Sequence, residues 1–407
     1  MNIGKIPLTN SELIKALFLS ESSFEQCTND EAVRRKMEIS HIWDQIEQSL
    51  SDQDFWSFIT NEKQSGYSTK IELLFDMISK KPQKTVDPLH TFLYFMKALT
   101  DYNKSLWELW LRIENYYLTL CHWYKDKNLY HKIGYLITVG ENIQELIEIS
   151  LNEKKDVFEI IIDDKIRDSL RFNIEELSYE KEGDYKKIDR VLLLFNVESI
   201  RNNLNIAEFY PFRFHKNVVW SIEHIHAQNS EGIDKTKKDP WLTWLRHHKK
   251  LIDEIVIGES PIKADDEWKE ILEEIQQLNE DNITWQTFNL LSNRIIIKLS
   301  DEENYDYEEM HSISNLALIG HHDNSILNNS VFEVKRRAII EMDKQGHYIP
   351  VCTRRVFLKY YNNNPSTQQY YYWGKQDRES YLYEIKKVLN DYLPQGELEM
   401  QNDYQSI

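Results

Sequence analysis

The sequence predicts a mainly α-helical fold, in which a helical N-terminal region is followed by an α+β region with a helical insertion. Apolar residues recur at helical spacing through long segments between residues 71 and 204. The pattern changes at Phe209–Phe214, an aromatic-rich stretch in which Pro211 interrupts any helix. Two short apolar runs, Val218–Trp220 and Leu316–Ile319, are each typical of a strand.

Length and composition indicate a folded protein of the cytoplasm. A chain of 407 residues can bury a large core and is long enough for two or three domains. It has only 11 glycines and 9 prolines, so no long flexible region is expected. Its 3 cysteines form no CxxC pair, which argues against a zinc knuckle or a disulfide scaffold. Because no apolar signal segment or run of about twenty apolar residues occurs, we expect a cytoplasmic protein outside the membrane.

The N-terminal region is expected to be helical throughout. A short helix should begin with a cap at Asn10 or Ser11, followed by the acid Glu12. A second helix is predicted over residues 31–60, with a stripe of core residues at spacings of three and four: Ile39, Ile42, Trp43, Ile46 and Leu50. The later amphipathic segments are Ile71–Ser79, Leu89–Trp123, Leu129–Ser150, Lys154–Ile174 and Tyr185–Leu204. We therefore predict a boundary near residue 205, with an all-helical domain over 31–205 and a second domain over 206–407.

An acid directly followed by a histidine stands at the end of the first predicted strand. These residues are Glu223 and His224, within the segment Ser221–Ile225. Later in the chain Asn315 precedes the second predicted strand, and Asn324 follows it nine positions after Asn315. An isolated Glu-His pair is usually an ordinary polar pair at a strand end. The added pattern of asparagine, strand, loop and asparagine favours a site that cleaves phosphodiester bonds.

The residue types suit one metal ion and one base. His224 is predicted to deprotonate a water molecule, and Glu223 and Asn324 are predicted to hold Mg²⁺ or Mn²⁺, which prefer hard oxygen ligands. Asn315 completes the catalytic set, and we expect it to tie the loop by backbone hydrogen bonds rather than bind the ion. Neighbouring residues on a regular strand point to opposite faces, so a turn or bulge is expected at Glu223 and His224.

A helical insertion is predicted between the two halves of this site. Helical periodicity returns beyond Pro240 and continues to about Leu299, so the insertion should span about residues 230–310. A further helix after Asn324 carries Phe332, Val334, Ile339 and Ile340. This helix would complete a strand–strand–helix (ββα) metal finger. His321 and His322 lie in the intervening loop, and a bystander role is favoured for them over metal ligation.

The net charge of −18 argues against a generally basic surface, so DNA would have to meet a local patch. Positive charge does collect in the second domain. The candidate DNA contacts are Lys249, Lys250, Lys335, Arg336 and Arg337. Each cluster could equally be a solvated helix face. Lys335 and Arg336 rank highest because they lie about three helical turns beyond Asn324.

At these residues the chain resembles the HNH-nuclease half of the GmrSD-type, modification-dependent restriction endonucleases (the GmrD-like half). The matching segments are Ile222–Ile225, Asn315–Leu318, Asn324 and Phe332–Arg336. Further similar segments are Lys5–Ala16, Phe55–Phe58, Leu129–Tyr135, Leu192–Asn196 and Pro350–Thr353. The resemblance covers most of the chain. One departure is Ala227, where many relatives have proline.

The resemblance implies a DNA endonuclease or nickase that acts in anti-phage defence, with modified phage DNA among its expected substrates. Relatives carry an upstream ParB/sulfiredoxin-like nucleotide-binding domain with an Asp-Gly-Gln-Gln-Arg motif, which this sequence lacks. Either a separate partner subunit supplies that domain, which we favour, or the chain is truncated. Residues 1–30 would then be the tail of that domain, with an apolar face around Leu13, Leu17 and Phe18 that needs covering.

Two other functions remain open at this point. The chain could be a catalytically silent assembly subunit that retains the nuclease fold as a scaffold. It could also be a nuclease that acts on RNA, since the metal and base would serve either backbone. One metal finger makes one cut, so a monomer should nick, and a double-strand break would need an oligomer or two events.

Overall fold

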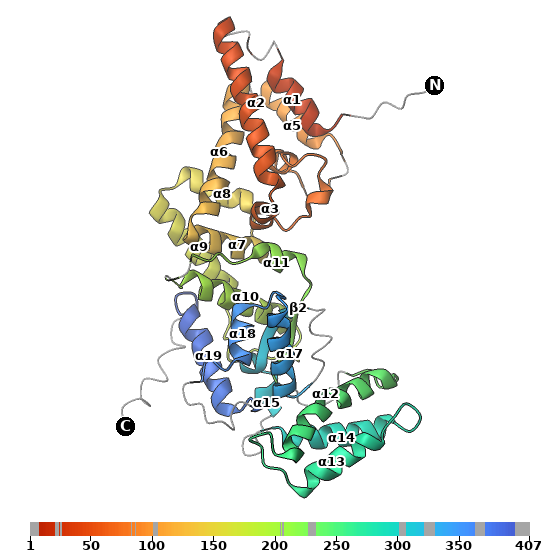
Figure 1. Ribbon diagram of the computed structural model, residues 1–407. Coiled ribbons are helices and arrows are strands. Elements are labelled where there is room, and N and C mark those ends of the chain that lie inside the picture. The colour runs from red at the N-terminus through yellow and green to blue at the C-terminus, as the bar shows by residue number, and fades with distance from the viewer. Residues whose placement is uncertain are drawn as a thin grey trace, which may run out of the picture. The chain divides into compact units, whose positions relative to one another are not determined.

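The computed structural model (Figure 1) describes residues 8–20, 24, 27–82, 84–85, 87–100, 105–203, 205, 207–226, 233–300, 307–320, 330–362 and 371–394. The chain is mainly α-helical, and the described strands form one two-stranded antiparallel sheet. It folds as two compact units. Unit 1 comprises residues 1–165 and 211–216, and unit 2 comprises 166–210 and 217–407. Residues 166–205 therefore pack with the strands. The predicted boundary near residue 205 placed them in the helical domain instead.

Unit 1 is a helical bundle. Its helices are α1 (Asn10–Leu19), α2 (Asn29–Ser51), α3 (Gln53–Ile59), α4 (Glu72–Ile78), α5 (His90–Thr100), α6 (Leu106–Lys125), α7 (Lys127–Thr138), α8 (Ile143–Asn152), the larger part of α9 (Lys155–Ser169) and most of α11 (Phe212–Asn217). A 3-10 turn, η2, spans Gln64–Gly66.

Helix α1 is capped by Thr9, not by the predicted Asn10 or Ser11. The Thr9 hydroxyl accepts from the Glu12 backbone N–H at 3.2 Å, and the Glu12 carboxylate accepts from the Thr9 N–H at 2.8 Å. This reciprocal capping box satisfies two backbone donors with one threonine and one glutamate. The predicted apolar face is partly covered, because Phe18 is fully buried against Phe95 and Trp110.

Four of the five residues of the predicted stripe are buried, Ile42 is half-buried, and the helix is shorter than expected. Ile39, Trp43, Ile46 and Leu50 are buried along α2. The helix ends at Asp52, whose carboxylate accepts from the N–H groups of the next residues and begins α3. The expected single helix over 31–60 is therefore two helices, because Asp52 favours the extended N-cap conformation over helix continuation.

Unit 2 contains the sheet and the helices around it. Its elements are α10 (Asp184–Arg201), β1 (Trp220–His224), α12 (Lys238–Ile257), α13 (Asp266–Gln277), α14 (Trp285–Lys298), α15 (Tyr307–Met310), η4 (Ile313–Asn315), β2 (Leu316–Gly320), α17 (Phe332–Lys344), α18 (Val351–Phe357) and α19 (Lys375–Leu389). Helices α10 and α18 pack against β2 (Figure 1), all five residues of which are buried.

The pairing of β1 with β2 is regular to its end. Trp220 pairs with Gly320 and His224 with Leu316, and the Ile225 N–H donates to the Asn315 carbonyl at 2.8 Å, which extends the ladder. The turn or bulge expected at Glu223 and His224 is therefore absent, because each residue has its own partner on β2. Their side chains leave opposite faces of the strand.

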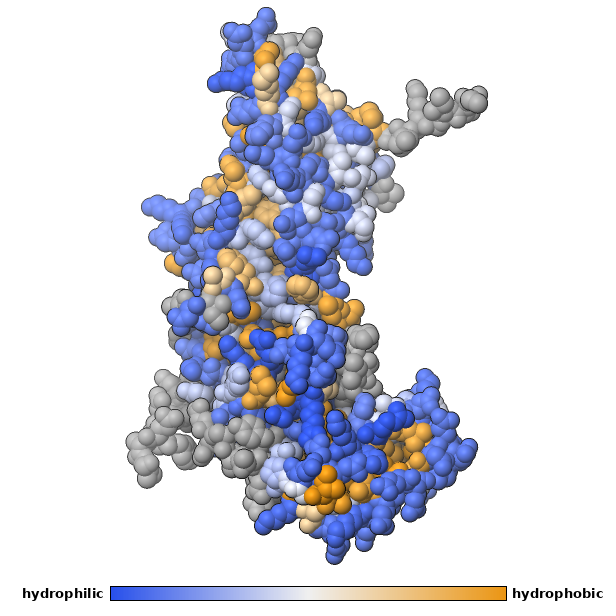
Figure 2. Space-filling model, viewed as in Figure 1, coloured by the Kyte–Doolittle hydropathy of each residue, from blue (hydrophilic) through white to orange (hydrophobic). Residues whose placement is uncertain are grey.

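The segment between the strands includes α12, α13 and α14, which group together in Figure 1 and precede α15 and η4. Their shared core contains Trp241, Trp244, Trp268 and Phe288. Apolar side chains also reach the surface, and orange residues are visible over these helices in Figure 2. Leu290 and Ile257 are 65% and 64% exposed.

Candidate functional site

Glu223 and Lys335 form an ion pair in the interior of unit 2. Lys335 comes from the first turn of α17 and is fully buried, and Glu223 on β1 is 8% exposed. The Lys335 ammonium donates to Glu223 Oε1 and, at 2.6 Å, to the His224 carbonyl oxygen. This ammonium fixes both the carboxylate and the end of β1. It would have to leave the pair before it could contact DNA.

His224 lies on the other face of β1, among polar neighbours that sequence analysis missed. Its Nε2 is 3.3 Å from His311 Nδ1, and its ring meets Tyr179 edge-on with centroids 4.9 Å apart. His311 Nε2 in turn lies 3.1 Å from Glu180 Oε1. Burial, together with the charge of Lys335 and with His311, lowers the pKa of His224 to about 3. The imidazole is therefore neutral at pH 7, and a pKa this low makes it a weak base in this conformation.

Tyr179 is a neighbour shared by Glu223 and His224. Its ring contacts His224. Burial raises the pKa of Tyr179, and the nearby Tyr185 and the negative charge of Glu223 raise it further. The Tyr179 N–H donates to the His311 carbonyl at 2.9 Å, which ties the two segments together. No periodicity marks this segment in the sequence, because it is a turn ahead of α10.

Asn315 is fully buried, and its side-chain amide makes hydrogen bonds to three backbone groups, two of His226 and one of Met310. Its oxygen accepts from the His226 N–H at 3.1 Å, while its nitrogen donates to the carbonyls of His226 at 3.1 Å and Met310 at 2.9 Å. Both amide hydrogens are therefore used. Asn315 fixes the chain after β1 to the chain before β2.

His226 is a second residue that sequence analysis missed. The Phe332 N–H at the start of α17 donates to its Nδ1 at 3.4 Å, so Nε2 carries the hydrogen and donates to Ser300 Oγ at 2.9 Å. His248 of α12 likewise accepts from the Val331 N–H, at 3.3 Å. Burial first, and nearby positive charges second, lower the pKa of His226 to about 3. Two neutral imidazoles thus satisfy backbone donors where α17 begins.

Asn324, His321 and His322 lie outside the described residues. Within the described residues, no group of three or more His, Cys, Asp or Glu side chains could hold a metal ion. Glu223 offers the two oxygens of one carboxylate as hard ligands, and its Oε1 already accepts a hydrogen bond from the Lys335 ammonium. Mg²⁺ commonly binds through one or two carboxylates and keeps several waters. The Glu223 carboxylate matches that donor chemistry as one ligand.

The other candidate DNA contacts differ in how far they are neutralised. Arg337 pairs with both carboxylate oxygens of Glu254, at 2.6 and 2.7 Å, and Arg336 pairs with Glu333 at 3.2 Å. Lys249 pairs with Asp253 at 2.6 Å, a contact within its own helix. Lys250 is exposed and makes no ion pair with the described residues.

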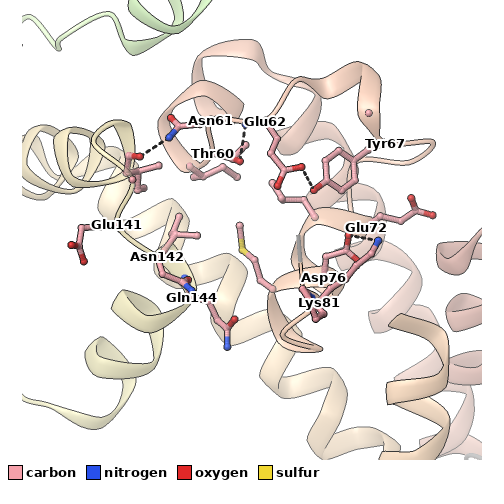
Figure 3. A pocket seen from close by; sticks show the side chains of 18 of the residues that line it. Thr60, Asn61, Glu62, Tyr67, Glu72, Asp76, Lys81, Glu141, Asn142 and Gln144 are labelled. Atoms are coloured by element: carbon pink, nitrogen blue, oxygen red, sulfur yellow. Dashed lines mark hydrogen bonds and ion pairs between the residues drawn. The ribbon is translucent and has the colours of Figure 1, made fainter. Parts of the chain in front are cut away.

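A cavity of about 640 Å³ lies in unit 1, apart from these residues (Figure 3). Four of its lining residues are acidic: Glu62, Glu72, Asp76 and Glu141. The Glu62 carboxylate accepts from the Tyr67 hydroxyl at 2.7 Å, and Asp76 pairs with Lys81 at 2.9 Å (Figure 3). Burial, followed by the charge of Asp76, raises the pKa of Glu72 although a backbone hydrogen bond opposes this. Such a lining repels phosphate.

Comparison with known protein families, with curated proteins and with solved structures found no match. None of the described helices has the length and apolar composition needed to cross a bilayer.

Proposed function

We propose that this chain is a metal-dependent HNH-type endonuclease, or nickase, that hydrolyses DNA phosphodiester bonds. The observation that carries the proposal is the pair at the end of β1, where a buried carboxylate, Glu223, directly precedes a neutral, partly buried imidazole, His224. The antiparallel strands β1 and β2 are followed by α17, whose Lys335 contacts both residues. We interpret this strand–strand–helix arrangement as a ββα metal finger.

In the proposed reaction His224 is the general base, which requires the end of β1 to bend when substrate binds, because Glu223 and His224 leave opposite faces of the regular strand. A neutral imidazole with one free ring nitrogen can take the proton from an attacking water. The carboxylate beside His311 Nε2 favours a proton on that nitrogen, so His311 Nδ1 accepts and His224 Nε2 donates. His224 Nδ1 is then the nitrogen left with a lone pair. His311 and Glu180 are thus positioning residues for His224.

Glu223 and Asn324 would hold Mg²⁺ or Mn²⁺ in this scheme, and Asn315 would keep the loop in place. A bound ion of this kind supplies charge neutralisation at the phosphate and at the leaving oxygen. Lys335 holds the Glu223 carboxylate through Oε1, which leaves Oε2 as a donor. The Lys335 ammonium also offsets the negative charge of the buried Glu223 carboxylate when no metal ion is bound.

The resemblance to the GmrD-like half supports the further proposals on substrate and partner. They are DNA as substrate, including modified phage DNA, a separate nucleotide-binding ParB/sulfiredoxin-like subunit, and a role in anti-phage defence. The silent assembly subunit is the second candidate. The observation that favours it is the Glu223–Lys335 pair, which already neutralises the carboxylate without a metal ion.

The test is conversion of supercoiled plasmid to nicked circle in Mg²⁺ or Mn²⁺, on plain and phage-modified DNA. The intact chain is compared with His224→Ala and with His41→Ala, which removes an exposed histidine, each with and without the protein encoded next to it. We expect nicking that His224→Ala lowers by about 10²–10⁴-fold and His41→Ala leaves unchanged. Absence of nicking under every condition, or equal nicking by His224→Ala, would overturn the proposal. Cleavage of RNA alone would replace DNA as the substrate.

A further inference from the structure

A second, smaller cavity of about 230 Å³ lies between α12 and α17. Two pairs of residues from α12 line it, each pair spaced by four positions: Arg246 with Lys250, and His247 with Leu251. Residues four apart lie on one face of a helix. Val334 and Ala338 are the corresponding pair from α17. The pocket therefore has an apolar floor, made by Leu251, Val334 and Ala338, and a basic rim.

The charge of this rim is unusual for a chain with a net charge of −18. Arg246 and Lys250 are exposed, and no described carboxylate forms a close ion pair with either, although, after the hydrogen bond from Arg337, the charge of Lys250 helps to lower the pKa of Glu254. Arg337 also lines the pocket, but Glu254 binds its guanidinium through both oxygens, so it contributes little free charge. Two cations thus stand above apolar side chains, and none of the described residues that line the cavity is acidic.

The same helix links this pocket to the candidate site. Lys335 on α17 contacts Glu223 and His224, whereas its neighbours on that helix, Val334 and Ala338, face the pocket. Ala338 is three residues from Lys335, so a ligand in the pocket lies beside the same turn of α17 that fixes the proposed catalytic pair.

We infer that the α12–α17 pocket holds one nucleotide unit of the substrate strand. Its phosphate lies against Arg246 and Lys250, and its sugar or base lies against Leu251, Val334 and Ala338. Guanidinium and ammonium groups match phosphate oxygens, and an apolar floor suits the uncharged part of a nucleotide but not an inorganic anion. This inference rests on the proposed nuclease function, since a free nucleotide would offer the same chemistry.

Binding measured without any divalent ion tests the inference separately from cleavage. Fluorescence anisotropy with labelled single-stranded and duplex oligonucleotides would follow the intact chain, the double variant Arg246→Ala/Lys250→Ala, and Ala338→Phe, which fills the pocket at constant charge. The matched control, Lys269→Ala/Lys375→Ala, removes two lysines whose side chains are 58% and 49% exposed elsewhere in unit 2. Thermal melting would verify that each variant folds.

We expect the double variant to weaken binding at least tenfold and to reduce the slope of log K against log salt by about 0.7–0.9, which corresponds to the one phosphate that is no longer neutralised. Ala338→Phe should weaken binding severalfold with the slope unchanged, and the control should bind like the intact chain. Unchanged binding by the folded double variant or by Ala338→Phe would overturn the inference. So would pocket-dependent binding of ATP or dAMP without binding of oligonucleotides, which would make the ligand a free nucleotide. Pocket-dependent DNA binding in a chain that never nicks would instead refute the proposed function.

Discussion

Two cavities lined by described residues differ in charge, and the difference distinguishes a structural polar site from a surface suited to nucleic acid. The unit 1 cavity is lined by four carboxylates, which bind Tyr67, Lys81 and other groups of the same unit. The α12–α17 pocket of unit 2 is smaller, and the charged residues among its described lining are all basic. Volume alone would favour the first cavity, whereas charge favours the second for a phosphate ligand.

The units also differ in how they bury ionisable groups. In unit 2 the buried Glu223 is paired with a fully buried lysine, and three histidines, His224, His226 and His248, have their pKa lowered to about 3. In unit 1 burial lowers the pKa of His215 to about 3 and the pKa of the neighbouring Lys216 to about 7. Burying unpaired charge is costly, so we expect changes of charge to affect unit 2 most.

The largest effect is expected for Lys335→Met. This change leaves the Glu223 carboxylate buried without its partner, which should lower the free energy of unfolding by about 3–5 kcal/mol. Lys298→Met is the matched control, because the partners of Lys298, Asp265 and Glu267, are about half exposed, and its cost should be about 1 kcal/mol or less. Denaturant unfolding measures both. Adding Glu223→Gln to Lys335→Met should recover much of the loss, and no recovery would contradict the buried pair.

A packing change in unit 1 should have the next largest effect. A Cβ at Gly134 on α7 would lie 2.1 Å from the Phe212 ring, so Gly134→Ala forces the ring to move. Overpacking of this kind costs about 1–3 kcal/mol, although alanine otherwise favours a helix. Gly66→Ala is the control, since its Cβ would meet nothing within 4 Å. If Gly134→Ala raised the melting temperature, the close approach of Phe212 would be wrong.

Acidification should destabilise unit 2 more than unit 1. The folded-state pKa of each of the three unit 2 histidines, about 3, lies below the unfolded value of about 6.5, so the unfolded chain binds the proton first as pH falls. Their stabilisation is complete above about pH 6.5 and is lost progressively toward pH 3, at about 1.4 kcal/mol per pH unit for each histidine.

His248→Asn should therefore reduce this pH slope by about 1.4 kcal/mol per unit while lowering stability at neutral pH. The exposed His41→Asn is its control. Denaturant unfolding at several pH values between 7 and 4 measures the slopes. An unchanged slope in His248→Asn would mean that this imidazole is not held neutral.

The smallest effect is expected in the acidic cavity. Glu62→Gln and Glu141→Gln should leave DNA binding and nicking unchanged, within about twofold. Plasmid nicking and anisotropy under the conditions above would measure this. A large loss of either activity would show that unit 1 takes part in the reaction, and would remove the contrast between the two cavities.

The sequence predicted most elements that have a strong local pattern. The apolar stripe of α2, the strand β2, the helix α17 and the helices between the strands all follow from periodicity. Boundaries were less predictable, because single polar residues such as Thr9 and Asp52 decide where helices start.

Interactions between distant segments could not be predicted in this way. Tyr179 and Glu180 reach the candidate site from a turn without periodicity, and His311 meets His224 across 87 positions of sequence. Lys335 was expected on the surface, but its pairing with Glu223 depends on how α17 packs against β1. The regular ladder at His224 likewise depends on β2, which no local pattern in β1 reveals.

The central claim is that Glu223 holds a divalent ion although Lys335 already binds it. Titration of the intact chain with Mn²⁺, followed by the loss of the free-ion EPR signal, tests this directly against Glu223→Gln and the exposed control Glu341→Gln. We predict saturable binding that Glu223→Gln weakens by about 10–100-fold or more and Glu341→Gln does not alter. Equal binding by Glu223→Gln, or no binding by the intact chain with DNA present, would contradict the account.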